Sequence, residues 1–255
     1  MIDKLKEAEL LQIAIDAALL GGEEIMKIYA EEFEVLTKQD NSPLTIADQN
    51  ANSIIEKVLQ KTGIPILSEE GKHEDYSIRK NWDKLWIVDP LDGTKEFVKR
   101  NGEFTVNIAL VENGKPVIGI IYVPVKKWLY YGSSVGAFKK VNGLIQKLPI
   151  YEDRNHLVVV GSRSHLSTET SDYFDSLKKK HGEIEIVSMG SSLKICLVAE
   201  GKADLYPRFA PTMEWDTAAG HAILNSVGKK LIDFKTKRPM EYNRINLINN
   251  WFIVK

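Results

Sequence analysis

The hydrophobic pattern changes character along the chain, and this change limits the folds that are open to it. Over residues 1–30 and 45–62, apolar side chains recur at three- and four-residue steps, which predicts two amphipathic helices. From Glu103 to Tyr131, apolar runs separated by short turns such as Asn113-Gly114 predict consecutive strands of an antiparallel meander. Such separate helical and extended stretches are typical of an α+β fold.

The second half of the chain mixes the two kinds of element more closely. Apolar runs and glycine stops predict strands at residues 157–160, 184–187 and 203–209, and helices at 168–180, 190–201 and 216–227. The sequence contains no repeat and no Pro/Ser-rich linker. We therefore expect one α+β unit over residues 1–255 that leans to a layered α/β arrangement, with approximate sub-lobes 1–150 and 151–255.

The composition excludes several classes of protein. Lys and Arg total 34 and Asp and Glu total 35, a formal net charge of −1, so the basic excess of a generic nucleic-acid-binding protein is missing. A single cysteine, Cys196, excludes an intramolecular disulfide framework and a multi-cysteine zinc site. The charged start MIDKLKEAELL is unlike a secretory signal, and no stretch has the roughly 18 apolar residues of a membrane span. We expect a soluble cytoplasmic protein.

The string DPLDGT, residues 89–94, is the most informative about chemistry. It follows the apolar run at residues 86–88, so we expect a strand to end at Asp89 and to lead into an acidic turn. Two carboxylates three positions apart, Asp89 and Asp92, can point into one crevice, where Mg²⁺ prefers oxygen ligands. A bare Asp-Gly pair is more often a simple turn, but a turn does not require these aspartates and Thr94 together.

Acidic residues in two further segments have both structural and functional interpretations. Glu69 and Glu70 follow a short apolar run, where exposed glutamates are usually only solvated. If that run lies beside the strand that ends at Asp89, Glu69 and Asp89 meet at one edge of a sheet, where ligand crevices form. Asp216 stands at the expected start of a helix, either as its N-cap or as a metal ligand near a terminus that attracts phosphate.

The three acidic segments resemble those of the inositol monophosphatase superfamily, which comprises Mg²⁺-dependent, lithium-sensitive phosphatases. The matching motifs are SEEG (68–71), WIVDPLDGT (86–94) and EWDTAAGHA (214–222), in the family's order and approximate spacing, and the resemblance covers nearly the whole chain. It implies a layered α-β-α-β-α sandwich like that of fructose-1,6-bisphosphatase. The metal ligands that it implies are Glu69, Asp89, the backbone carbonyl of Leu91, Asp92 and Asp216.

The resemblance also implies hydrolysis of a phosphate monoester with two or three Mg²⁺ ions, inhibited by Li⁺. The ions would hold the phosphoryl oxygens and lower the pKa of a water molecule. Glu69, together with Thr94 paired to Asp48 of SPLTIADQ, would orient and deprotonate this water for in-line attack. Backbone N–H groups of Gly93 and Thr94 would stabilise the transferred group. Cys196 is expected to be a buried core thiol.

Three longer stretches resemble the 3′(2′),5′-bisphosphate nucleotidase branch of the family, close to the bacterial enzymes of sulfate assimilation. They are residues 89–110, SRSH (162–165) and residues 190–209. Within the first, Lys95-Glu96 replaces the Thr-Asn typical of inositol phosphatases. The implied reaction converts 3′-phosphoadenosine 5′-phosphate to AMP and phosphate, and 3′-phosphoadenylyl sulfate is a related candidate substrate.

The phosphate that such a substrate keeps needs protein partners of its own. By motif position these are His165, Ser191, Lys194 and Arg208, and the bidentate guanidinium of arginine suits phosphate well. The simpler interpretations are a solvated helix residue for Lys194 and a loop residue for His165. Sub-lobe 1–150 would then carry the metal site, and 151–255 would contact the nucleotide. Further substrate contacts implied at the metal site are Glu69, Leu91, Asp92, Gly93, Thr94 and Asp216.

Other functions remain as alternatives at this stage. An inositol or sugar monophosphate phosphatase shares the chemistry and differs in substrate preference. A non-catalytic nucleotide or metal sensor is disfavoured because every carboxylate of the implied set, and Thr94, is present. A purely structural metal site stays open, and it predicts that a chelator lowers the melting temperature and that no phosphatase activity exists at any metal concentration. A nucleic-acid polymer is not an expected partner. The sequence leaves open the choice between monomer and homodimer, and peripheral association with the cytoplasmic face of the inner membrane.

Overall fold

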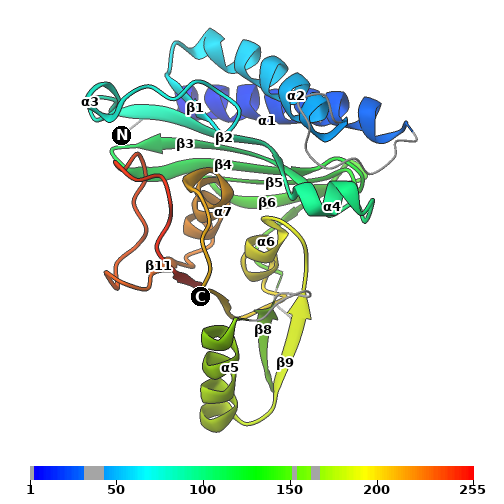
Figure 1. Ribbon diagram of the computed structural model, residues 1–255, viewed down its shortest axis with the longest axis vertical. Coiled ribbons are helices and arrows are strands. Elements are labelled where there is room, and N and C mark those ends of the chain that lie inside the picture. Colours follow the sequence, from blue (N-terminus) through cyan, green and yellow to red (C-terminus); the bar gives the residue numbers. More distant parts are fainter. Residues whose placement is uncertain (1–2, 32–42, 151–153, 162–166) are drawn as a thin grey trace.

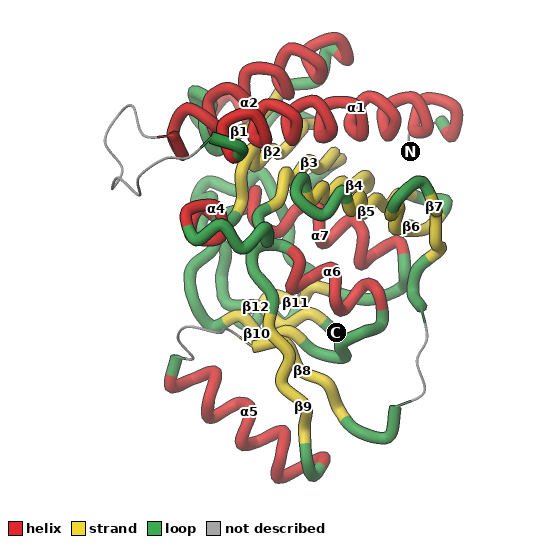
Figure 2. Tube along the Cα trace, turned by 90° about the vertical axis from the view of Figure 1, so that its right-hand side faces the viewer, coloured by secondary structure: helices red, strands yellow, loops and turns green. Residues whose placement is uncertain are grey.

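Helices and strands stack in five alternating layers in the computed structural model, which describes residues 3–31, 43–150, 154–161 and 167–255 (Figures 1 and 2). The predicted α+β class and the layered α-β-α-β-α sandwich are confirmed. From one side to the other, the layers are α1 (Lys4–Tyr29) with α2 (Pro43–Leu59), a seven-stranded sheet, α6 (Leu193–Glu200) with α7 (Glu214–Ser226), a layer of short strands, and α5 (Thr168–His181).

The seven-stranded sheet keeps its strands in chain order. The first two strands are parallel, and every later pair is antiparallel, as the predicted meander requires. Its strands are β1 (Ile66–Ser68), β2 (Lys84–Asp92), β3 (Thr105–Glu112), β4 (Lys115–Val123), β5 (Trp128–Ser133), β6 (Gly136–Val141) and β7 (Leu144–Lys147).

Both faces of this sheet are covered, so its central strands are apolar on each side. On β3, Ile108 and Leu110 belong to the core beneath α1 and α2, whereas Ala109 and Val111 belong to the core against α6 and α7. The alternation follows from the period of two in a strand. The helix–sheet contact is close at Gly119 of β4, where a Cβ atom would lie 2.1 Å from the carbonyl oxygen of Ala219 in α7. Glycine is therefore required there.

The second strand layer is assembled from short pieces. β8 (Leu157–Gly161) pairs in parallel with β9 (Ile184–Ser188), and an isolated bridge joins Val159 to Leu205. Next to it, an antiparallel sheet has the order β10 (Tyr206–Arg208), β12 (Phe252–Val254), β11 (Leu231–Asp233). The elements β11, β12 and the short helices α3 (Tyr76–Arg79) and α4 (Thr94–Val98) were not predicted from the sequence, whereas the 3₁₀ turn η1 (Gln60–Thr62) falls at the end of the helix predicted over residues 45–62. Such short elements carry too few periods to show a pattern.

Two predicted boundaries at the acidic motifs are wrong. β2 does not end at Asp89, because Asp92 still pairs with Thr105 after a register shift between Asp89 and Asp92. The shift fits Pro90, which has no N–H group to donate to the ladder. Helix α7 begins at Glu214, so Asp216 is not its N-cap residue.

No helix among the described residues is long and apolar enough to cross a membrane.

Candidate active site

The acidic ends of β1 and β2 lie side by side at one edge of the sheet. The two strands run parallel with Ser68 opposite Val88, so Glu69 follows beside Asp89. The backbone N–H of Glu69 donates to the carbonyl oxygen of Val88 at 3.1 Å, which continues the pairing. The charge of Glu69 also raises the pKa of both Asp89 and Asp216. Glu70 is exposed at the same strand end.

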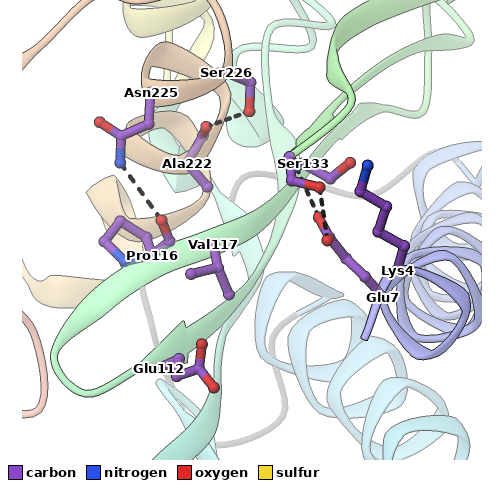
Figure 3. Close-up of a pocket in the computed structure, with 10 residues that line it drawn as sticks. Lys4, Glu7, Glu112, Pro116, Val117, Ser133, Ala222, Asn225 and Ser226 are labelled. Atoms are coloured by element: carbon purple, nitrogen blue, oxygen red, sulfur yellow. Dashed lines mark hydrogen bonds between the residues drawn. The ribbon is translucent and has the colours of Figure 1, made fainter. Parts of the chain in front are cut away.

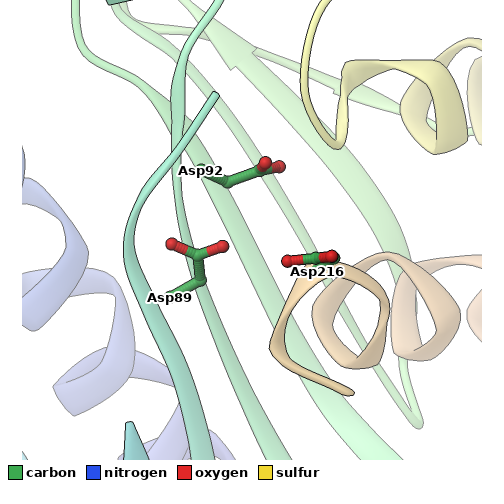
Figure 4. A group of neighbouring side chains, drawn as sticks. All are labelled: Asp89, Asp92 and Asp216. Atoms are coloured by element: carbon green, nitrogen blue, oxygen red, sulfur yellow. The ribbon is translucent and has the colours of Figure 1, made fainter. Parts of the chain in front are cut away.

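Three aspartates converge at this edge. Asp89 and Asp92 come from the end of β2 and Asp216 from the first turn of α7, and Figure 4 shows their carboxylates pointing toward one another. One oxygen from each lies within 4.8 Å of the others. Asp89 is only 1% exposed, and this burial, followed by the charges of Asp92, Glu69, Asp216 and Asp48, raises its pKa well above the usual range.

Burial and the neighbouring Asp92 likewise raise the pKa of Asp216, to about 7. Its Oδ2 atom accepts a hydrogen bond from the backbone N–H of Met213 at 2.8 Å, which holds the side chain at the start of α7. Crowded, desolvated carboxylates repel one another, and a hard divalent cation with oxygen ligands relieves this repulsion. The donor set therefore fits Mg²⁺ or a similar ion.

The carboxylate of Asp92 is held by side chains that the sequence analysis did not single out. Its Oδ2 atom accepts from the backbone N–H and the hydroxyl of Ser192, at 2.7 and 2.6 Å, and from Nδ2 of Asn107 at 3.3 Å. Thr105 lies 3.4 Å from the same oxygen. A signal for two of them was present, because Thr105 and Asn107 are polar at alternate positions of the otherwise apolar stretch FTVNIAL.

The remaining residues of the DPLDGT string surround the aspartates. Leu91 is buried, and its backbone N–H donates to Oδ1 of Asp89 at 3.1 Å. Gly93 has φ +94°, and a Cβ atom there would lie 3.1 Å from Cβ of Ser191. Thr94 opens helix α4. Asp48 lies buried on α2, and its charge acts on Asp89. Its pairing with Thr94 stays a prediction.

Basic residues line the same pocket as Asp92 and Asp216. This pocket has a volume of about 380 Å³ and includes Asp92, Asp216, Ser191, Lys194 and Arg208. The hydroxyl of Ser191 donates to the carbonyl oxygen of Asp92 at 2.9 Å, and Nζ of Lys194 donates to the carbonyl oxygen of Met189 at 3.2 Å. Burial lowers the pKa of Lys194 although Asp92 opposes this effect.

Arg208, which lines this pocket, has one donor without a partner in the described part of the chain. Its Nε atom is buried and has no hydrogen-bond partner among the residues that the structure describes. Such an atom is costly unless a ligand or water accepts from it. His165, the other predicted contact to the second phosphate, lies outside the described residues.

A buried hydrogen-bond network connects the start of α7 to the C-terminal segment. Glu214 is fully buried and accepts from the backbone N–H groups of Asn243 and Arg244, at 2.6 and 3.0 Å, and from Nε of Arg244 at 3.0 Å. The amide of Asn249 donates to the carbonyl oxygen of Met213 at 2.6 Å. The C-terminal segment therefore holds the turn that carries Asp216.

A second pocket, of about 460 Å³, lies at the opposite end of α7 (Figure 3). Of its two acidic residues, Glu7 accepts from the N–H and the hydroxyl of Ser134, both at 2.7 Å, and Glu112 forms an ion pair with Lys84 at 3.3 Å. The group of carboxylates found at the end of β2 has no counterpart among the described residues that line this pocket. The acidic end of β2 is therefore the candidate active site.

Curated proteins that are similar to this chain include 3′(2′),5′-bisphosphate nucleotidases. The chain is 46% identical over 249 residues to the 3′(2′),5′-bisphosphate nucleotidase CysQ of Salmonella typhimurium, covering 96% of this chain and 99% of the relative. It is 45% identical over 239 residues to the protein of the same name from Escherichia coli strain K12, covering 92% of this chain and 94% of the relative.

Solved structures and a family model lead to the same family. CysQ from Bacteroides thetaiotaomicron, described as a bacterial member of the inositol monophosphatase family, superposes with a TM-score of 0.92 at 54% identity, over 96% of each chain. Inositol monophosphatase-II from Staphylococcus aureus shares the fold, with a TM-score of 0.77 at 23% identity over 96% of this chain and 88% of that one. The model of the inositol monophosphatase family matches residues 6–251. The chain therefore belongs to the inositol monophosphatase family.

Proposed function

We propose that this chain is a Mg²⁺-dependent phosphomonoesterase that hydrolyses the 3′-phosphate of 3′-phosphoadenosine 5′-phosphate, giving AMP and phosphate. The observation that carries the proposal is one pocket lined by both Asp92 and Asp216 and by Lys194 and Arg208. Acidic and basic groups together suit a substrate with one phosphate at a metal and another at cations. The relatives named 3′(2′),5′-bisphosphate nucleotidase, at 45–46% identity, support this substrate class.

The proposed metal ligands are Glu69, Asp89, the carbonyl oxygen of Leu91, Asp92 and Asp216. When bound there, two or three Mg²⁺ ions would neutralise the phosphoryl oxygens and make a water molecule more acidic. The raised pKa of Asp89 and Asp216 supports this assignment, because burial and mutual repulsion disfavour their ionised forms and a bound cation would compensate both effects. Inhibition by Li⁺ belongs to the same proposal.

The protein's own groups would position and activate the attacking water. Glu69 is exposed and follows β1 beside Asp89, and its carboxylate would accept a proton from this water. Thr94, with Asp48 as its partner, would orient the water for in-line attack on phosphorus. The backbone N–H groups at Gly93 and Thr94 begin helix α4 and would donate to the transferred phosphoryl group.

The phosphate that is not hydrolysed would bind on the α6 side of the pocket. Lys194 and Arg208 supply positive charge there, and the unused Nε donor of Arg208 supports a direct contact to an anion. Ser191 would add its N–H group or hydroxyl, and His165 belongs to the same proposed set. Residues 1–150 would thus hold most of the metal site, and residues 151–255 would contact the nucleotide.

The substrate assignment is tested by phosphate release from a panel of monoesters, with Mg²⁺ present and with Li⁺ added. We expect 3′-phosphoadenosine 5′-phosphate to be hydrolysed with a higher kcat/KM than inositol 1-phosphate, and Arg208→Ala to raise KM for the bisphosphate alone. Faster hydrolysis of the inositol ester by the unmodified protein would overturn the assignment in favour of an inositol phosphatase. A cytoplasmic location is part of the proposal, and cell fractionation tests it and shows whether any of the protein sediments with the inner membrane.

A further inference from the structure

We propose that Asn107 and Ser192 are positioning residues that orient the Asp92 carboxylate and join it to the helix that carries Asp216. Neither residue belongs to the metal ligands or substrate contacts proposed above. The inference rests on the proposed function, since it assigns these residues to the metal site of the same reaction. Both side chains are buried, Asn107 at 1% and Ser192 at 4% exposure, so bulk water does not compete for their hydrogen bonds.

The first observation is that the hydrogen bonds of Asp92 are unequally divided between its two oxygens. The N–H and hydroxyl of Ser192 and the amide of Asn107 all approach Oδ2, at 2.7, 2.6 and 3.3 Å. With its acceptor capacity used in this way, Oδ2 is a poor site for a cation. The carboxylate thus presents Oδ1 as its metal-facing oxygen.

The second observation is that Ser192 connects four elements through one hydroxyl group. Its Oγ atom accepts from Nδ2 of Asn107 at 2.9 Å. Its single proton lies between Oδ2 of Asp92, at 2.6 Å, and the carbonyl oxygen of Asp216, at 2.9 Å. The N-cap of α6 is therefore tied to β2, β3 and the first turn of α7 at one point.

The orientation of the Asn107 amide is fixed as well. Its Oδ1 atom, which can only accept, lies 2.9 Å from the hydroxyl of Thr105, and this leaves Nδ2 directed at Asp92 and Ser192. An amide fixed in this way sets the rotation of the carboxylate that it contacts. Residues that orient metal ligands typically change metal affinity or activity by about 10- to 100-fold when they are removed.

The test is a double-mutant cycle on Ser192→Ala and Asn107→Ala, with Ser226→Ala as a matched control. Ser226 lies on α7 at the far end from Asp216, and its hydroxyl donates to the carbonyl oxygen of Ala222 at 2.9 Å. Binding of Mn²⁺ without substrate is measured by electron paramagnetic resonance, and kcat and KM are measured with saturating Mg²⁺. The melting temperature establishes that each variant is folded.

We expect each single variant to bind Mn²⁺ about 10- to 100-fold more weakly, while the KM for 3′-phosphoadenosine 5′-phosphate stays near that of the unmodified protein. Because both residues act on the same carboxylate, that of Asp92, the Mn²⁺ affinity of the double variant should be little lower than that of the weaker-binding single variant. Ser226→Ala should bind Mn²⁺ normally.

Unchanged Mn²⁺ binding in folded Ser192→Ala would overturn the inference, and so would losses that add in the double variant. Ser192→Ala removes a single oxygen atom and decides the question even if Asn107→Ala does not fold. Failure of the proposed function is separable, because it would appear as an unmodified protein that binds Mn²⁺ without hydrolysing the bisphosphate.

Discussion

Near the candidate active site, the two faces of β2 and β3 carry buried side chains of different polarity. On the face toward α1 and α2, Val88 lies opposite Ile108, and both are fully buried in an apolar core. One residue further along, on the face toward α6 and α7, Asp89 lies opposite Asn107, and both are equally buried. Adjacent positions of the same pair of strands thus carry an apolar pair on one face and a polar pair on the other.

This difference shows how one sheet serves stability and chemistry at once. The apolar pair lies within a continuous core, whose contribution grows with the area removed from water. The polar pair lies where the first turns of α6 and α7 arrive, and burial there raises the pKa of Asp89 instead of stabilising the fold. Substitutions on the polar face should therefore change activity, and substitutions on the apolar face should change stability.

The largest expected effect is on activity, from Asp89→Asn on the polar face. Loss of this carboxylate removes a proposed metal ligand, and kcat/KM with Mg²⁺ should fall by about 10³-fold or more. The metal-free variant should melt no lower than the unmodified protein, because a desolvated carboxyl group has been removed. The exposed Glu70→Gln is the matched control and should keep its activity within about twofold. Equal rates of phosphate release by the two variants would contradict the role of the polar face in catalysis.

The next effect is on stability, from Ile108→Ala on the apolar face. Truncation of this fully buried side chain should lower the free energy of unfolding by about 2–5 kcal/mol. Phosphate release per folded molecule should change little, because the side chain points away from the aspartates. Urea unfolding, together with kcat measured well below the melting temperature, checks both parts. A loss of kcat in the folded variant would show that the two faces are not independent.

The smallest effect is a pH dependence of stability in the metal-free protein. The pKa of Asp216 is about 7 in the folded chain, above its usual value of 3.8, and that of Asp89 is also raised. Because these two carboxyl groups bind more protons in the folded state than in the unfolded state between these values, their contribution to stability is greatest at low pH and falls as the pH rises through about 7.

We expect the melting temperature of the chelated protein to fall between about pH 6.5 and about pH 8, where the buried His221, whose pKa is lowered to about 4, no longer opposes the effect. Added Mg²⁺ should restore it at the higher pH, because the cation binds the ionised carboxylates. Differential scanning fluorimetry across this range is the measurement. A melting temperature that rises with pH in the chelated protein would contradict the assignment.

Sequence patterns were sufficient for the long elements of the fold. The three- and four-residue periodicity predicted α1 and α2 closely, and the aliphatic runs with Asn-Gly turns predicted β3, β4 and β5. The end of β2 was missed, because its continuation to Asp92 depends on pairing with β3 rather than on local propensity. For the same reason β11 and β12 were missed: each is three residues long and exists through its neighbour.

At the site, the sequence identified the residues that carry charge but not those that arrange them. Asp89, Asp92 and Asp216 stand in recognisable motifs, and the structure brings them together. Asn107 and Ser192 are common polar residues, and their contact with Asp92 depends on how α6 meets β3, about 85 residues apart in sequence. The structural role of the fully buried Glu214 was not predicted either, because its partner Arg244 lies in the C-terminal segment, 30 residues away in sequence.

The most direct test of the central claim is the amount of Mn²⁺ or Mg²⁺ bound by Asp92→Ala and Asp216→Ala, measured by calorimetry beside phosphate release. The claim is that carboxylates from β2 and α7 form one metal site that performs the hydrolysis. It predicts that each variant stays folded, binds fewer ions or binds them far more weakly, and releases no phosphate above background. Normal metal binding and undiminished phosphate release in both variants would contradict it.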